Sequence, residues 1–219
     1  MVFYSLRFDT FTTIKNFEMK YSLIVLLLLF SFYIKGQETL LLLNGKQYSG
    51  VALDTAGLKI NFSIYRPGKK AKQKYFYRDQ VFSITNELDE EHVFYYPDLY
   101  FVNEYSVEDM RLDISGRIDA RNGFKTKWVY PVGFATGFLA GFFSKGSALS
   151  ALVPVAFIGV VQIPIVKIQH QSISNPDFIG NEYYAGGYDQ SARMKRTKHA
   201  IISGFAGLIA GIFMYEVTK

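Results

Sequence analysis

The sequence predicts an α+β fold, in which a small antiparallel β-barrel or sheet is followed by a membrane-associated, glycine-rich helical unit. Three observations indicate this. Between Glu38 and Pro97, polar and apolar residues alternate and turn signals recur, which is typical of short antiparallel strands. From Trp128 onward, apolar blocks appear, and two of them carry a small residue every four positions. Hydrophobic residues make up 49% of the chain and charged residues 20%, in separate blocks, as expected for a membrane protein with a water-facing domain.

The chain has 219 residues, a formal net charge of +5 and no cysteine. Without cysteine it has no disulfide, no thiolate metal site, no cysteine nucleophile and no lipid anchor of the bacterial lipoprotein kind. Many of the basic residues lie beside the apolar blocks. We therefore expect membrane lipid as a partner, through anionic headgroups, and no nucleic acid.

Residues 1–36 are predicted to be a signal peptide with an upstream extension. Met19 and Lys20 precede an apolar run of about a dozen residues, and Gly36 offers a small residue near the cleavage point. The run is short for a membrane span, which needs about 20 residues, and this favours a cleaved leader over the alternative of an uncleaved anchor. The mature chain would then begin near Gln37 and be exported.

Residues 37–105 are predicted to form a small β-rich domain. Asn44-Gly45 lies between two alternating segments and is the strongest short-range signal for a hairpin. The segment Leu43–Val51, LNGKQYSGV, has two glycines spaced for a bent hairpin and resembles the first half of an Sm-type or SH3-like small barrel. That resemblance implies a fold and no RNA ligand. The expected strands are Thr39–Leu43, Gln47–Leu53, Leu58–Tyr65, Lys74–Tyr77, Val81–Thr85 and His92–Tyr96.

Residues 106–127 are predicted to form an amphipathic connector helix. Ser106 can cap its N-terminus, and Glu108 and Asp109 complement the positive first turn. Apolar residues then follow at helical spacing as far as Ile118. One face of this helix is therefore available to the sheet or to the membrane surface.

The C-terminal part is divided into a glycine-rich apolar helical hairpin at 128–168, a polar tyrosine-containing loop with a basic helix start at 169–198, and an apolar helix at 199–219. Small residues spaced by four lie on one face of a helix and let another backbone approach. The pattern resembles the glycine zipper of small bacterial envelope and pore-forming proteins, which implies close packing within one chain or between copies. The two rows are Gly133, Gly137 and Gly141, and Ser203, Gly207 and Gly211.

The apolar blocks are short for a bilayer and show an internal repeat. Val129–Phe143 would be about 22 Å long as a helix, against a hydrocarbon thickness of about 30 Å. Pro154 and Pro164 interrupt the next block, so we expect a re-entrant or partly spanning hairpin.

A shift of 71 residues aligns Gly116 with Gly187, and 7 of 27 positions agree from Gly116 onward. The repeat suggests that one structural unit occurs twice in the chain. This unit is a basic segment followed by an apolar helix with a row of small residues.

Six basic residues precede the first and third apolar blocks and are expected to contact lipid headgroups: Lys125, Lys127, Arg193, Lys195, Arg196 and Lys198. The alternative is that they only position the helix ends.

The positive-inside rule would place these residues and the sheet in the cytoplasm, whereas the leader sends the sheet outside. Because the leader is the more specific pattern, we expect an exported β-domain in a bacterial cell envelope.

No catalytic, cofactor-binding or metal-binding motif stands out in the sequence. His92, His170 and His199 are far apart and show no metal-ligand spacing. The common signatures of hydrolases, phosphate-binding loops and zinc proteases are missing as well.

We therefore expect a membrane-anchored envelope protein with a structural or interaction role, and not an enzyme. Its partners would be lipid, an envelope protein or a second copy of the chain. The alternatives are an oligomeric pore or transport component, and an enzyme whose soluble domain has no recognisable motif.

Overall fold

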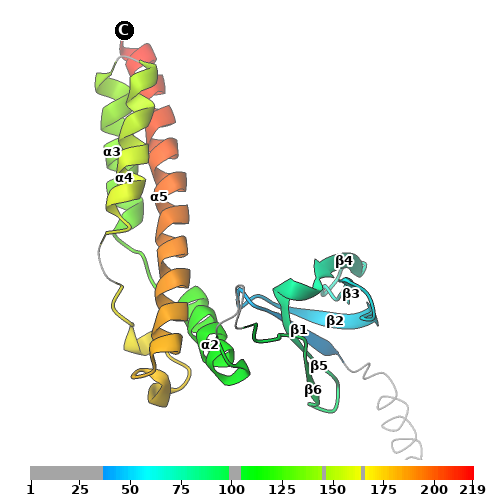
Figure 1. The fold of residues 1–219 in the computed structure, drawn as a ribbon. Coiled ribbons are helices and arrows are strands. Elements are labelled where there is room, and N and C mark those ends of the chain that lie inside the picture. Colours follow the sequence, from blue (N-terminus) through cyan, green and yellow to red (C-terminus); the bar gives the residue numbers. More distant parts are fainter. Residues whose placement is uncertain (1–36, 99–104, 145–146, 164–165) are drawn as a thin grey trace, which may run out of the picture.

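The computed structural model describes residues 37–98, 105–144, 147–163 and 166–219, so the predicted leader lies outside the described residues. The N-terminal half forms a sheet and the C-terminal half is helical (Figure 1), which confirms the α+β class. The strands are β1 (Glu38–Leu42), β2 (Gln47–Asp54), β3 (Lys59–Ile64), β4 (Lys72–Tyr77), β5 (Val81–Thr85) and β6 (Glu91–Val93). The helices are α2 (Val107–Gly123), α3 (Val129–Phe143), α4 (Leu152–Val160) and α5 (Glu182–Thr218). Short 3-10 turns lie at Arg78–Gln80, Ala148–Ala151, His170–Ser172 and Pro176–Phe178.

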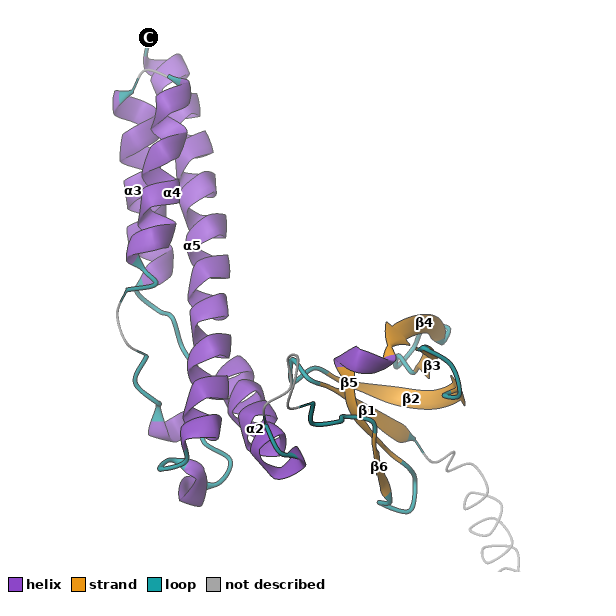
Figure 2. Ribbon diagram, in the orientation of Figure 1, coloured by secondary structure: helices purple, strands orange, loops and turns teal. Residues whose placement is uncertain are grey.

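The sheet is open, with the order β4-β3-β2-β1-β5-β6 and antiparallel pairing throughout. The predicted turn at Asn44-Gly45 joins β1 to β2, and Gly45 has a φ of +73°, which disfavours any side chain. At Gly50 the two strands β2 and β3 approach so closely that a Cβ would come within 3.0 Å of the Ser63 carbonyl oxygen. These glycines allow the sheet to bend. Figure 2 shows that β4 and β6 nevertheless remain at its two edges, so the described strands form a sheet and not a closed barrel.

Strand β1 ends in three consecutive leucines because both of its faces are covered there. Leu40 and Leu42 lie in the core on the concave side of the sheet, and Leu41 and Leu43 pack in a second cluster against α2. A strand that is buried on both faces loses the alternation of a half-exposed strand. The concave core also contains Ile60, Phe62, Ile64, Phe76, Val81 and Ile84.

Helix α2 joins the sheet to the helical region. Ser106 Oγ accepts the Asp109 amide N–H, and the Asp109 carboxylate accepts the Ser106 amide N–H, which gives a complete capping box where the sequence predicted a cap. One face of α2, centred on Ile114, packs on Phe82 and Tyr95 beside the sheet. Another face packs on α5. The connector is therefore held between the sheet and the longest helix.

Helix α5 begins at Glu182, where the sequence predicted a polar loop that ends in a basic helix start, so the residues from 182 up to that start are helix and not loop. Asn181 Oδ1 accepts the amide N–H groups of the first helical turn. Tyr184 and Tyr188 are fully buried against α2 and the segment that precedes α5. Burial of two large side chains outweighs the low helix propensity of Gly186-Gly187, which made the segment look like a loop.

The helices α3 and α4 form the predicted apolar hairpin, and both lie beside the C-terminal part of α5 (Figures 1 and 2). Pro154 is in the first turn of α4, where the missing N–H of proline costs no helical hydrogen bond. Pro164 lies outside the described residues. We call α3, α4 and residues 200–217 of α5 the apolar shaft.

Candidate membrane interface

Helices α3 and α5 meet along a seam of small residues. A Cβ on Gly137 would lie less than 3.0 Å from the Gly204 carbonyl oxygen, and a Cβ on Gly207 would lie less than 3.0 Å from the Phe134 carbonyl oxygen. Contacts this short leave no room for a side chain on either helix. The seam contains all six residues for which the sequence predicts helix packing: Gly133, Gly137, Gly141, Ser203, Gly207 and Gly211.

Helices α2 and α5 also make reciprocal contacts through glycines, and these contacts explain the internal repeat of the sequence. Gly116 of α2 faces the Tyr184 carbonyl, while Gly187 of α5 faces the Asp113 carbonyl. The glycines therefore recur 71 positions apart, at 116 and 187, and the carbonyls that they face belong to positions 113 and 184, which are related by the same shift. The interrupted segment α2–α3 is the first copy of the repeat, and it packs in parallel on the second copy, the continuous helix α5.

The repeat changes register once, at the loop between α2 and α3. Gly137 and Gly207 form a reciprocal pair in the seam, and they are 70 residues apart instead of 71. Gly133 accordingly lies closest to Ser203, whereas Gly204, which the 71-residue shift matches to it, lies closest to Pro154. The loop absorbs the difference of one residue because α5 continues without a break.

This loop lies beside the point where α5 changes from polar to apolar. The Gln169 side chain accepts the Lys125 amide N–H and donates to the Lys125 carbonyl, so the exposed backbone is paired within the protein. Thr126 Oγ1 hydrogen-bonds His199 Nδ1. Burial, and then the charges of nearby lysines, lower the pKa of His199 below its ordinary value, so the imidazole is neutral at pH 7.

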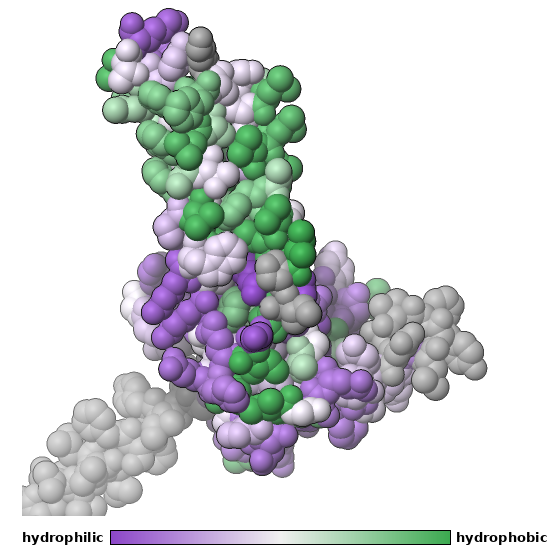
Figure 3. All heavy atoms as spheres, turned by 90° about the vertical axis from the view of Figure 1, so that its left-hand side faces the viewer, coloured by the Kyte–Doolittle hydropathy of each residue, from purple (hydrophilic) through white to green (hydrophobic). Residues whose placement is uncertain are grey.

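The apolar shaft has its small residues inside and its large residues outside. The buried residues of α3 are Val129 and three glycines, while Phe143 on α3 and Phe213 on α5 expose 70% or more of their surface. Figure 3 shows apolar residues covering this end of the molecule and hydrophilic residues covering the other. A water-soluble bundle places its large apolar side chains in the core, and exposed patches of this extent mark an interaction surface.

The six cations predicted to contact headgroups all lie near the base of the shaft, but the structure gives them different surroundings. Lys125, Lys127 and Lys198 are exposed. Arg193 forms an ion pair with Asp189. Arg196 is a correction to the prediction, because it is only 7% exposed and its guanidinium lies over the Phe124 ring. The helix faces inward at this position, toward α2, and this direction could not be read from the sequence. Lys195 is half-buried and donates to the Arg121 carbonyl.

A buried polar cluster ties α2, α5 and the intervening segment together. Tyr184 donates its hydroxyl to the Asp119 carboxylate at 2.7 Å, and the Ser174 amide and hydroxyl donate to the same oxygen at 2.9 Å. Burial raises the pKa of Tyr184 and the bond to Asp119 raises it further, so the tyrosine stays a donor. The role of this cluster is structural, because its hydrogen bonds join α2, α5 and the segment between them.

We expect Tyr184→Phe to lower the free energy of unfolding in detergent by about 1–3 kcal/mol, because it removes a donor from a buried carboxylate. The matched control is Tyr183→Phe, which changes the neighbouring residue that packs edge-on against Tyr105. This control should shift stability by less than about 0.5 kcal/mol. Equal effects of the two variants would contradict the role given to the Asp119 bond.

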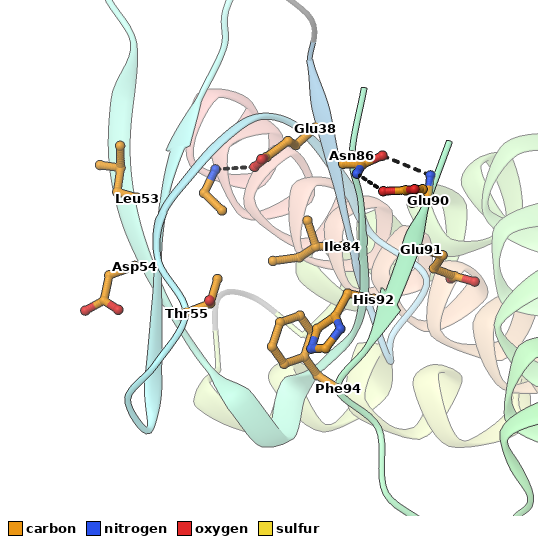
Figure 4. Close-up of a pocket in the computed structure, with 11 residues that line it drawn as sticks. Glu38, Leu53, Asp54, Thr55, Ile84, Asn86, Glu90, Glu91, His92 and Phe94 are labelled. Atoms are coloured by element: carbon orange, nitrogen blue, oxygen red, sulfur yellow. Dashed lines mark hydrogen bonds between the residues drawn. The ribbon is translucent and has the colours of Figure 1, made fainter. Parts of the chain in front are cut away.

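The sheet carries an open cavity of about 520 Å³ that contains His92 and several carboxylates (Figure 4). Each carboxylate already has a structural partner. Glu38 accepts the Ala52 amide, Glu90 accepts from the Asn86 side chain, and Glu91 pairs with Arg111 at 2.7 Å. The remaining one, Asp54, accepts the amide of Ala56.

The His92 ring packs edge-on against Phe94, and no hydrogen bond joins it to a carboxylate among the described residues. The structure separates the three histidines: His170 is exposed on a 3-10 turn and His199 lies at the base of the shaft. The described part of the chain contains no group of three or more histidine, aspartate or glutamate residues arranged to hold a metal ion. Comparison with protein-family models, with curated proteins and with solved structures gives no match for this chain.

Proposed function

We propose that the protein is a non-enzymatic, membrane-anchored protein of the cell envelope, in which the apolar shaft is embedded in lipid and holds the sheet at the membrane surface. The observation that carries this proposal is the distribution of side chains on the shaft. Helix α5 is long and apolar enough to cross a membrane, yet only 33% of its most apolar stretch is buried in the protein. A core helix of a soluble protein would be mostly buried.

The lengths of the helices fit a shallow or partly spanning unit. Residues 200–217 of α5 extend about 27 Å and α3 about 22 Å, compared with about 30 Å of hydrocarbon. Trp128 and Tyr130 lie at the base of the shaft and are both about half exposed, as expected of aromatic residues at a membrane interface. Lys125 and Lys127, which come just before Trp128 in the sequence, place positive charges at the same end of the shaft.

The sheet supports an interaction role. β4 is an edge strand, so one side of its backbone is free for another chain. Tyr75 and Tyr77 on this strand are more than half exposed, and Lys72 and Lys74 precede them in the same strand. Exposed tyrosines and basic residues on a free edge suit an acidic protein partner that adds a strand.

The seam bears on the alternative of an oligomeric pore. In that hypothesis the small residues join copies of the chain. Here Gly137 and Gly207 are already covered by the backbone of the same chain. The pore alternative would therefore need a different contact surface between copies.

Membrane insertion is tested by alkaline carbonate extraction of native membranes, where we expect the chain to remain in the pellet. Release into the soluble fraction would overturn the proposal. Because the chain has no cysteine, single thiols introduced as Ser49→Cys on the sheet and Lys219→Cys at the shaft tip can be labelled with a membrane-impermeant maleimide. Labelling of Ser49→Cys in intact cells supports export, as the leader predicts. Its protection there, with labelling after lysis, supports the cytoplasmic side favoured by the positive-inside rule.

A further inference from the structure

A second cavity, of about 330 Å³, lies where the β1–β2 turn and the end of α2 meet α5. It is adjacent to the base of the apolar shaft, because one of its lining residues is His199, which directly precedes the apolar part of α5. Its lining contains four cations and no carboxylate. The lining residues are Lys46, Arg121, Ser191, Met194, Lys195, Lys198 and His199.

The four positive charges are not neutralised within the described part of the chain. The three ion pairs found among the described residues are formed elsewhere, by Arg111, Arg117 and Arg193. Arg121 and Lys195 each donate to a backbone carbonyl, which does not cancel a charge. Burial lowers the pKa of both groups. Holding these charges together therefore costs free energy that a bound anion would offset.

A second, independent feature is a buried hydroxyl that lacks a partner. Ser191 is 5% exposed, and its Oγ has no hydrogen-bond partner among the described residues. Most buried hydroxyl groups are hydrogen-bonded, because leaving one unpaired is unfavourable. Ser191 lines the same cavity as the four cations. A ligand with acceptor oxygens would satisfy this group once the side chain turned its hydroxyl toward the cavity.

We propose that this cavity binds the phosphate of an anionic phospholipid at the membrane surface. The four cations supply charge-assisted hydrogen bonds to the phosphate oxygens, and Ser191 donates its hydroxyl. Met194, about half exposed at the cavity, offers an apolar contact to the glycerol and upper acyl region of the lipid. The position beside the shaft favours a lipid over free phosphate. This inference rests on the proposed membrane function.

The test uses Trp128, the only tryptophan in the chain, which is exposed at the base of the shaft. The full chain is reconstituted in phosphatidylcholine bilayers that contain either brominated phosphatidylcholine or brominated phosphatidylglycerol, and quenching of Trp128 gives the relative association of the two lipids. We expect at least about a fivefold preference for phosphatidylglycerol. Lys46→Gln with Lys198→Gln should reduce the preference to near one, and both side chains are exposed, so folding should be retained.

The control is Lys69→Gln with Lys70→Gln, which makes the same charge change on the exposed β3–β4 turn. It should keep the preference. Ser191→Ala should lower the preference two- to threefold without moving the unfolding midpoint.

Equal preferences in the wild type for the two lipids, or equal losses in test and control variants, would overturn the proposal. Free phosphate would be the ligand instead if inorganic phosphate raised the unfolding midpoint in pure phosphatidylcholine bilayers and Lys198→Gln abolished this effect. Quenching by brominated phosphatidylcholine tests membrane embedding separately, so loss of all quenching would reject the proposed function itself.

Discussion

Gly137→Leu is expected to separate α3 from α5 and to lower the free energy of unfolding in detergent by about 3 kcal/mol or more. A side chain at this position would meet the Gly204 carbonyl and the Leu208 amide, both of which belong to the backbone of α5. Backbone atoms within a helix cannot move aside in the way that the end of a flexible side chain can. Overpacking of this kind is costly, and here it would act on the central contact of the seam. The measurement is an SDS titration of the micelle-bound protein followed by circular dichroism.

The matched control is Gly159→Leu, which places the same side chain on the apolar helix α4. A Cβ at Gly159 meets no atom within 4 Å, so this leucine would point into lipid or detergent. We expect no loss of stability and a small gain, because leucine has a higher helix propensity than glycine. If both variants unfolded at the same SDS concentration as the wild type, the close approach of α3 and α5 would be wrong.

The adjacent glycines of α5 provide the second large effect, and they should respond in opposite directions. Gly187→Ala is expected to destabilise the protein by about 1–3 kcal/mol, because the new methyl group would lie less than 3.0 Å from the Asp113 carbonyl of α2. Gly186→Ala is expected to stabilise it by up to about 1 kcal/mol, because a Cβ there meets no atom within 4 Å and alanine is the better helix former.

This pair is informative because the two substitutions are identical in chemistry and neighbouring in sequence. A destabilisation of both variants would indicate that the segment around Gly186 and Gly187 is not a regular helix, in line with the loop that the sequence had suggested there. A stabilisation of both would indicate that α2 does not pack on α5 at Gly187. The same SDS titration can be applied, together with limited proteolysis near Asp113 to detect release of α2.

Several elements could be predicted because short-range chemistry determines them. Asn44-Gly45 forms the predicted hairpin turn because Gly45 readily adopts the positive φ that this turn contains. Ser106 caps α2 because its side chain and that of Asp109 pair with backbone groups only three residues away. The small-residue rows were visible as a spacing of four within each helix.

The features that were missed depend on contacts between distant segments. Residues 182–198 are helical because Tyr184 and Tyr188 are buried against α2, and their partners lie about 65 residues earlier in the chain or in the intervening segment. Arg196 was expected at the surface and is buried for the same reason. Lys46 and Arg121 escaped notice as members of a cationic cavity, because no local signal connects a β-turn with the end of a helix.

By itself, the sequence determined the α+β class, the order of the strands along the chain, the capped start of α2 and the spacing of the seam residues, all of which follow from period, turn chemistry and capping within a few positions. Only the tertiary structure decided that the two rows of small residues face each other within one chain, in parallel and with reciprocal contacts. It also decided which of the basic residues are buried and which surround a cavity. The physical reason is that close packing of backbones and the burial of charge depend on segments about 70 residues apart in sequence, and local patterns do not encode how such segments are oriented toward each other.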